Sequence, residues 1–274
     1  IRLAGPKLTK EGAGLRTLYI SPLKALATDV ARNLIAPISE LGLKITTETR
    51  SGDTSAARRQ RQRTKPPQIL LTTPEQVALL LSHPDAPYLF ADLDTIILDE
   101  LHALAASKRG DLLSLDLARL RQIAPSLMTV GLSATVARPS ELRAYLVAQP
   151  QPDAQTELAE IIEIKGGAAP RIKILDGESE VPWSGHTAQY AYAEIYRAIL
   201  DHRMTILFVN TRMQAEYAFQ ELWRINDKNL PIALHHGSLD LAQRKKVEAA
   251  MASGKIRAVV ATSTLDLGID WGDV

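Results

Sequence analysis

The 274-residue sequence contains no cysteine, which excludes disulfide bonds and structural zinc sites built on thiolates. It also lacks any apolar run of the length that a membrane span requires. Its opening residues, IRLAGPKLTKEG, do not have the charged-then-apolar pattern of a secretory signal. With 46% hydrophobic residues, the chain has ample material for a packed core. We therefore expect a soluble intracellular protein without a membrane partner.

Aromatic residues are scarce, at 5% of the chain, and the net charge is only +1. The scarcity of aromatics disfavours a platform that stacks successive bases. One local stretch, ARRQRQRTK at 57–65, carries five cationic residues and no acid. This stretch either lines the path of a nucleic-acid backbone or forms a solvated helix face, and the second interpretation is the commoner one.

The chain contains an internal repeat of strand-helix units. RTLYIS at 16–21 and TILFVN at 205–210 are each an apolar strand followed by an amphipathic helix. Both are followed by a glycine-containing turn, a basic helix and a further strand, PQILLTT or IRAVVAT. Ser21 and Asn210 lie 189 positions apart, as do Thr73 and Thr262. This alternation predicts two α/β domains with parallel sheets covered by helices on both faces.

The region between the repeats is rich in turn-forming residues, including AQPQPDAQ and GESEVPWSGH. We expect a first domain over 1–150, a linker over 151–187 and a second domain over 188–274. Within the linker, ELAEIIEIK at 157–165 and RIKIL at 171–175 are predicted strands.

Polar residues follow each predicted strand of the first domain. In open parallel sheets, ligands bind beyond the carboxyl ends of the strands. The polar residues after the strands should therefore all lie at one edge of the sheet. They are Ser21 and Pro22, then Thr72 to Glu75, then Asp99 and Glu100, and then Ser133 to Thr135.

The acid pair after TIIL has two interpretations. Asp99 is a candidate Mg²⁺ ligand, and Glu100 is a candidate base for the attacking water in phosphoanhydride hydrolysis. Alternatively, the pair is an acidic first turn that suits a helix N-terminus. The segment GLSAT, whose Ser133 lies 31 positions after His102, favours hydrolysis. His235 and His236 are not expected to share a metal ion, because neighbouring strand residues point to opposite faces.

A series of motifs resembles those of superfamily 2 DExH-box helicases. LDELH resembles motif II, SPLKALATDV motif Ia, SGD and TTPE the Ib and Ic region, and GLSAT motif III. ILFVNTR resembles motif IV, and VVATSTLDLGID resembles motif V. DELHALAASKRG, HHGSLD and LDLGIDWGDV resemble the Lhr (large helicase-related) branch, and within it the bacterial helicases associated with DNA ligase.

This resemblance implies two RecA-like domains in tandem that use ATP and Mg²⁺ for 3′-to-5′ movement on nucleic acid, with DNA or DNA-RNA hybrids favoured. It assigns Mg²⁺ to Asp99, catalysis to Asp99, Glu100 and His102, and coupling to Ser133 and Thr135. Gly268 and Asp270 match nucleotide-binding positions. The matching positions for single-stranded or partly duplex nucleic acid are Ser21, Pro22, Thr73, Asn210, Arg212 and Thr262. It also implies a bacterial cytoplasmic protein with a ligase or nuclease as repair partner.

The chain has no G-x-x-x-x-G-K-[ST] phosphate loop and no motif VI arginines. We expect a segment of a longer helicase, whose first domain lacks the phosphate-loop strand and therefore has an unsealed sheet edge, and which hydrolyses ATP negligibly by itself. Two alternatives stay open: a binding or scaffolding module without catalysis, and a translocase on duplex that does not separate strands. Asp99 and Glu100 weigh against the first, and the motifs do not decide on the second.

Overall fold

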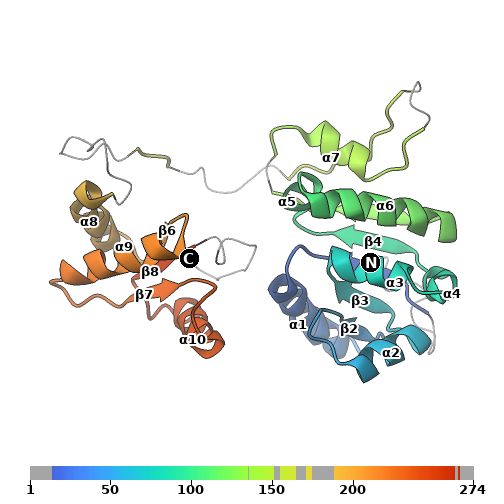
Figure 1. Ribbon diagram of the computed structural model, residues 1–274, viewed down its shortest axis with the longest axis horizontal. Coiled ribbons are helices and arrows are strands. Elements are labelled where there is room, and N and C mark those ends of the chain that lie inside the picture. Colours follow the sequence, from blue (N-terminus) through green and yellow to red (C-terminus); the bar gives the residue numbers. More distant parts are fainter. Residues whose placement is uncertain are drawn as a thin grey trace. The chain divides into compact units, whose positions relative to one another are not determined.

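The computed structural model describes residues 14–134, 136–150, 155–164, 171–174, 188–262 and 265. The chain forms two compact units, 1–164 and 165–274. Each unit contains its own parallel sheet (Figure 1). The predicted α/β class with two parallel-sheet domains in tandem is therefore confirmed. None of the described helices is both long and apolar enough to cross a membrane.

The sheet of the first unit has five parallel strands in the order β2-β3-β1-β4-β5. These strands are β1 (Thr17–Ile20), β2 (Thr47–Thr49), β3 (Ile69–Thr72), β4 (Thr95–Leu98) and β5 (Met128–Gly131). All residues of β1 and β3 are buried, whereas those of β5 are only partly buried. β5 lies at an edge of the sheet, and no described strand pairs with its outer side.

The helices of the first unit cover both faces of this sheet (Figure 1). They are α1 (Lys24–Glu40), α2 (Ala56–Thr64), α3 (Pro74–Leu81), α4 (Ala86–Phe90), α5 (Leu101–Ala105), α6 (Lys108–Ile123) and α7 (Pro139–Tyr145). Leu18 and Ile20 of β1 enter a large apolar cluster with α3, α4 and α6. Tyr19, between them, enters a second cluster with Ala27 and Ala31 of α1. The alternation of side chains along β1 thus supplies both cores.

The second unit has a three-stranded parallel sheet in the order β6-β8-β7. Its elements are η2 (Gln189–Ala191), α8 (Tyr192–Asp201), β6 (Thr205–Phe208), α9 (Arg212–Arg224), β7 (Ile232–His235), α10 (Leu241–Ala252) and β8 (Ala258–Ala261). Val260 packs with α8 and α9 on one face, and Val259 packs with Met251 of α10 on the other. Thr211 and Gln214 form a capping box at the start of α9, which satisfies backbone donors that the helix leaves unpaired.

The internal repeat is reproduced in the topology. In the first unit β3 lies between β2 and β1, and in the second unit β8 lies between β7 and β6. The strands correspond in chain order, because β1, β2 and β3 match β6, β7 and β8. All pairings in both sheets are parallel. The repeat predicted from the sequence is therefore a repeat of strand order as well as of pattern.

The two strands predicted within the linker are wrong in the residues that the structure describes. Residues 155–164 and 171–174 form neither helix nor strand. Ile162 and Ile164 are 89% and 91% exposed, and Ile172 is 89% exposed. An alternating apolar pattern becomes a strand only where a neighbouring strand receives its hydrogen bonds. No described strand pairs with these segments.

Asp116 of α6 is a buried carboxyl whose Oδ2 has no hydrogen-bond partner among the described residues. Burial raises the pKa of Asp116 from 3.8 to about 6, against the opposing charge of Arg119. The pKa of Asp116 is higher in the folded state than in the unfolded state. Its protonation therefore favours folding at low pH, and this contribution to stability is lost as the pH rises through about 6.

Replacing Asp116 by asparagine should therefore stabilise the protein at pH 7, by on the order of 2 kcal/mol, and should have little effect below about pH 4. Urea unfolding between pH 4 and pH 8 measures the difference from the unsubstituted chain. Asp111→Asn, at an exposed position of the same helix, is the control. Equal stability of D116N and the unsubstituted chain at pH 7 would contradict the prediction.

Candidate nucleotide and nucleic-acid site

The polar residues after the strands of the first unit lie along one edge of the sheet, as predicted. The hydrogen-bond ladder continues one residue beyond the strands at this edge. Ser21 N donates to Thr72 O at 3.0 Å, Asp99 N to Ile20 O at 2.9 Å, and Leu132 N to Leu98 O at 2.8 Å. Because these bonds hold backbone atoms, the positions of the side chains at the edge are set by the sheet itself.

Asp99 accepts a hydrogen bond on each carboxylate oxygen. The backbone N–H of Glu100 donates to Oδ1 at 2.9 Å, and the hydroxyl of Tyr19 donates to Oδ2 at 2.5 Å. Burial and the neighbouring Asp99 raise the pKa of Tyr19 well above its usual range, which keeps the phenol protonated as a donor. Tyr19 was not among the residues singled out from the sequence, where it is one more apolar-type residue of a strand.

Glu100 occupies an unusual backbone conformation directly after Asp99. Its φ of 49° and ψ of 44° lie in the left-handed region, which costs about 1 kcal/mol or more for a residue with a Cβ. The conformation reverses the chain sharply between β4 and α5. Strained backbone of this kind clusters at functional sites, and here it lies within the predicted acid pair.

His102 connects the acid pair to the end of β5. Its Nδ1 lies 3.0 Å from the hydroxyl oxygen of Ser133, and its Nε2 lies 3.4 Å from Oε2 of Glu100. With a proton on Nε2, the ring donates towards the Glu100 carboxylate and accepts from Ser133. The structure thus brings Glu100, His102 and Ser133 together. Thr135, the second predicted coupling residue, lies outside the described residues.

Arg109, which sequence reasoning missed, joins the loop after β1 to the first turn of α3. Its Nε and one terminal nitrogen donate to the two carboxylate oxygens of Glu75, the latter at 3.0 Å. Its other terminal nitrogen donates to the carbonyl of Pro22 at 2.8 Å. Burial works to raise the pKa of Glu75, but hydrogen bonds from Arg109, from its own backbone and from Thr73 outweigh burial and lower it. In the sequence, the signal that points to Arg109 is the basic KRG within DELHALAASKRG.

The predicted nucleic-acid residues of this unit are mostly buried. Ser21 is fully buried, and its hydroxyl donates to the carbonyl of Leu23 at 3.2 Å. Pro22 is also buried, and Thr73 is 8% exposed. These residues shape the loops at the edge, while Arg109 and Glu75 are the more exposed groups beside them.

The corresponding edge of the second unit holds the remaining predicted nucleic-acid residues. Asn210 and Arg212 follow β6 and are exposed, and Arg212 donates a hydrogen bond to the hydroxyl of Ser238. Thr262 follows β8, is 7% exposed, and donates its backbone N–H to His235 O at 3.2 Å. Gly268 and Asp270 lie outside the described residues.

His235 and His236 are both buried and point to different helices. His235 Nε2 lies 3.1 Å from Glu248 of α10, whereas His236 Nε2 lies 3.3 Å from Glu216 of α9. These helices cover opposite faces of the sheet, so the predicted divergence of the two side chains is confirmed. The two imidazoles do not converge on one ion.

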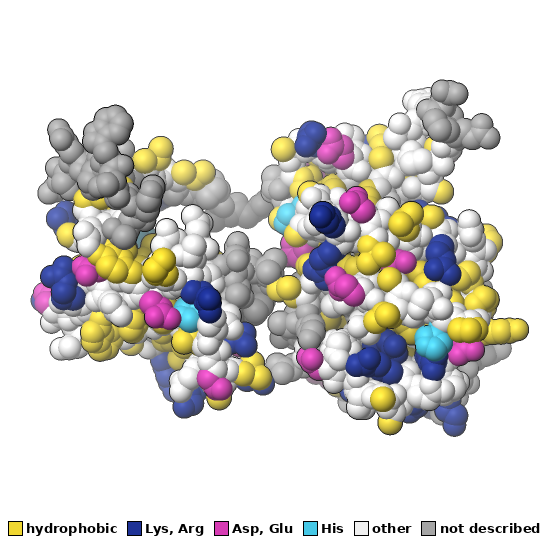
Figure 2. All heavy atoms as spheres, viewed as in Figure 1, with side chains coloured by type: hydrophobic (Ala, Val, Ile, Leu, Met, Phe, Trp, Pro, Cys, Tyr) yellow, Lys and Arg dark blue, Asp and Glu magenta, His cyan; other side chains and the backbone are white. Residues whose placement is uncertain are grey.

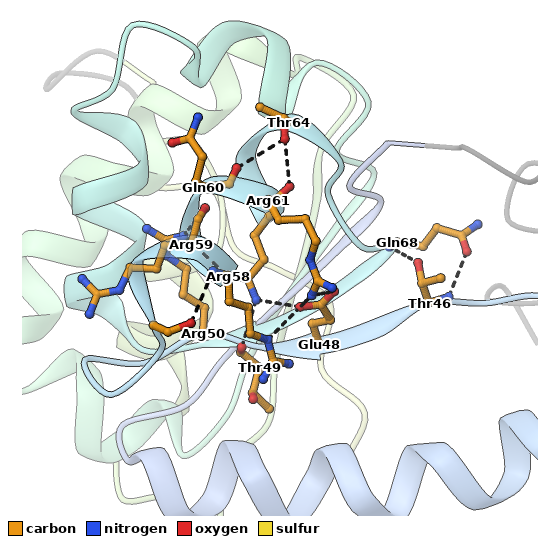
Figure 3. A network of polar contacts seen from close by, with 12 residues as sticks. Thr46, Glu48, Thr49, Arg50, Arg58, Arg59, Gln60, Arg61, Thr64 and Gln68 are labelled. Atoms are coloured by element: carbon orange, nitrogen blue, oxygen red, sulfur yellow. Dashed lines mark hydrogen bonds and ion pairs between the residues drawn. The ribbon is translucent and has the colours of Figure 1, made fainter.

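The arginines of α2 are largely occupied by partners within the protein (Figure 3). Glu48 of β2 receives hydrogen bonds from Arg58 at 3.0 Å and from Arg61 at 2.6 Å. Arg59 donates to the backbone of Thr54 and Gly52. In Figure 2, the Lys and Arg side chains in the region of α2 have acidic and histidine side chains beside them. The structure thus favours the interpretation of α2 as a charged surface helix over that of a free cationic track.

Comparison with known proteins places this geometry in a family. The model of the DEAD/DEAH box helicases matches residues 3–142, and that of the helicase conserved C-terminal domain matches residues 191–274. The chain is 34% identical to the ATP-dependent helicase Lhr-Core protein 2 of Thermococcus barophilus, over 97% of this chain and 33% of that protein.

Solved structures agree with these sequence matches. The helicase Lhr of Mycobacterium smegmatis bound to ssDNA and AMP-PNP is similar with a TM-score of 0.69 and 36% identity, covering 100% of this chain and 36% of that one. The helicase MrfA bound to DNA is similar with a TM-score of 0.73 and 26% identity, covering 95% and 37%. The chain thus spans about a third of the length of these proteins.

The resemblance to the Lhr helicases predicted from the motifs is confirmed by these similarities. The first family model alone covers more than half of the chain. Two RecA-like domains are therefore the fold of the protein, and the chain belongs to the DEAD/DEAH box helicase family.

Proposed function

We propose that this chain is the motor segment of an ATP-dependent helicase of the Lhr type, which moves 3′ to 5′ on a single strand of nucleic acid. The observation that carries the proposal is the series of contacts from Asp99 and Glu100 through His102 to Ser133 at one sheet edge. This arrangement links a candidate hydrolytic carboxylate pair to the neighbouring strand. The Lhr protein of M. smegmatis, similar over the whole chain, was captured with ssDNA and AMP-PNP.

The carboxylates fit a magnesium ion that is held jointly with a nucleotide. Hard oxygen donors such as Asp99 and Glu100 suit Mg²⁺, which is usually bound through one or two carboxylates together with substrate phosphates. The described residues contain no group of three or more acidic, His or Cys side chains that would hold a metal alone. When bound, Mg²⁺ neutralises charge on the phosphates of ATP.

The protein's own residues have separate roles in the proposed mechanism. Asp99 would hold the ion, and Glu100 would accept the proton of the attacking water. His102 contacts both Glu100 and Ser133, so a change at the carboxylate alters the bond to the end of β5. This contact is the proposed route by which hydrolysis is coupled to strand movement through Ser133 and Thr135.

Nucleic acid is proposed to lie across the loops at the sheet edges. The proposed positions are Ser21, Pro22, Thr73, Asn210, Arg212 and Thr262. The exposed Asn210 and Arg212 offer their side chains, and the buried members order the loops whose backbone faces the strand. Backbone and hydroxyl groups at helix N-termini bind phosphates without reading sequence. Gly268 and Asp270 are proposed to contact the nucleotide. We place the two motor domains at 1–150 and 188–274, joined by 151–187.

DNA is the proposed substrate, and repair in the bacterial cytoplasm with a ligase or nuclease partner is the proposed setting. Both rest on the motif resemblance and on the DNA-bound state of the Lhr and MrfA structures. A translocase that does not separate strands is the alternative, and a strand-displacement assay distinguishes it. A scaffold without catalysis is disfavoured by the ordered contacts of Asp99 and Glu100.

Glu100→Gln in a full-length protein that carries this chain should abolish turnover but not binding. Glutamine keeps the size of the side chain and cannot accept the proton, so we expect ATP hydrolysis to fall at least about 100-fold. Fluorescence titrations should show unchanged affinity for AMP-PNP and for single-stranded DNA. Glu141→Gln, at an exposed position of α7, is the matched control. Undiminished turnover in E100Q would remove Glu100 from the mechanism.

Residues 1–274 alone should hydrolyse ATP at the background rate. The phosphate-loop lysine that contacts the β- and γ-phosphates is absent from the sequence. A steady-state phosphate-release assay, with and without single-stranded DNA, checks this expectation. The positive control is a helicase of the same family that carries a phosphate loop. Robust DNA-stimulated hydrolysis by residues 1–274 would contradict the prediction.

Arg109→Ala should weaken the binding of single-stranded DNA by roughly tenfold, the equivalent of one interaction of about 1.4 kcal/mol. Without the guanidinium, the loop at Pro22 and the start of α3 at Glu75 lose the group that fixes their spacing. Stability should change little, because exposed ion pairs contribute at most about 1 kcal/mol. Arg109→Lys should bind as weakly, since lysine cannot reproduce the forked contact.

The control for Arg109 is Arg138→Ala, which removes an exposed ion pair with Glu141 at 2.7 Å in the same unit. Fluorescence anisotropy with a labelled single strand gives the affinities, and thermal unfolding gives the stabilities. DNA binding by R109A that equals binding by R138A would show that Arg109 does not order these loops.

A further inference from the structure

Tyr19 is a buried residue of β1 whose hydroxyl reaches the functional edge of the sheet. Its side chain is 8% exposed and packs with Ala27 and Ala31 of α1 and with Leu71 of β3. The hydroxyl donates to Oδ2 of Asp99 at 2.5 Å. The two residues are 80 positions apart in the sequence.

The register of the sheet explains why these two side chains meet. Tyr19 lies opposite Ile97 of the neighbouring parallel strand β4. Asp99 follows Ile97 by two residues, and side chains two positions apart on a strand point to the same face. Asp99 therefore lies diagonally beyond Tyr19 on the α1 face, within reach of the phenol.

The phenol hydroxyl is not required for packing. The neighbours of the ring in its cluster are apolar, and a phenylalanine would fill the same space. A buried hydroxyl carries a desolvation cost unless it is hydrogen-bonded. Its partner here is the carboxylate of Asp99, whose second oxygen is already held by the backbone N–H of Glu100. Together the two donors fix the plane of the carboxylate.

We propose that Tyr19 is a positioning residue, which holds the Asp99 carboxylate in the orientation that receives a magnesium-bound nucleotide. The proposal deepens the proposed function and rests on it. Residues that orient a metal-binding carboxylate raise metal affinity because the ligand loses no rotational freedom when the ion binds. The phenol has no proposed contact with the nucleotide or the reacting atoms.

Tyr145 provides a matched comparison in the same unit. Its hydroxyl donates to the backbone carbonyl of Gly110 at 2.7 Å, and burial raises its pKa to about 12. Tyr145→Phe and Tyr19→Phe each remove one partly or fully buried hydroxyl with one hydrogen bond. Both should lower the unfolding temperature by a similar, small amount. Only Tyr19→Phe should change the magnesium dependence of nucleotide binding and hydrolysis.

The experiment compares Tyr19→Phe and Tyr145→Phe in a full-length protein that carries this chain. Equilibrium titration with AMP-PNP is performed in Mg²⁺ and in EDTA, and the Mg²⁺ concentration that gives half-maximal ATP hydrolysis is measured. For Y19F we expect that concentration to rise about tenfold, weaker binding of AMP-PNP in Mg²⁺, and unchanged binding in EDTA. Y145F should match the unsubstituted protein in all three measurements.

A second variant pair tests whether Tyr19 acts through Asp99. In an Asp99→Asn background, Tyr19→Phe should produce no further loss of magnesium-dependent AMP-PNP binding, because the orientation of the carboxylate no longer matters. A Y19F protein that loses only thermal stability, with the magnesium dependence of the unsubstituted protein, overturns the proposal and leaves the proposed function intact. Absence of magnesium-dependent nucleotide binding in the unsubstituted protein overturns both.

Discussion

The parallel register of β1, β3, β4 and β5 is the constraint on which the site depends. Because all four strands run in one direction and pair without offset, the residues that follow them emerge at one level of one edge. Ser21 and Ser133 lie 112 positions apart in the sequence, yet the backbone ladder brings them, together with Thr73 and Asp99, to a common edge. The side-chain bonds of Tyr19, His102 and Arg109 then set orientations within that frame.

The second unit repeats this plan with fewer strands. Its central strand β8 has the place of β3, and the residue after it, Thr262, has the place of Thr73. The two copies differ at the strand end that carries the acids, since no described strand of the second unit corresponds to β4. One unit therefore holds the carboxylate pair, and both hold the hydroxyl and amide groups suited to a phosphate backbone.

Much of the fold could be predicted from the sequence because its signals are local. The apolar runs of β1, β3, β4 and β8 and the capping Thr211 specify their elements through residues close in the chain. The same local reasoning failed for 157–164, where an isoleucine-rich stretch needs a partner strand that the pattern cannot supply. Whether such a pattern is satisfied is a property of the whole fold.

The candidate site was predicted unevenly for a related reason. Asp99, Glu100 and His102 stand together in the sequence, so their motif was visible. Tyr19 and Arg109 act on residues 80 and 34 positions away, and only the folded chain shows those contacts. The burial of Ser21 likewise depends on packing across the sheet. A motif therefore predicts that a residue lies at the edge of the sheet, whereas the orientation of its side chain is set by residues from other parts of the sequence.

The pairing of the α2 arginines with Glu48 has a consequence for how a strand would be held. A polyanion releases condensed counterions only where protein cations replace them, and the slope of log affinity against log salt counts those replacements. The single carboxylate of Glu48 offsets one of the positive charges of α2, and that charge contributes little to the count. The ionic-strength dependence of association should thus be shallower, by about one replaced counterion, than the number of cationic residues in α2 implies.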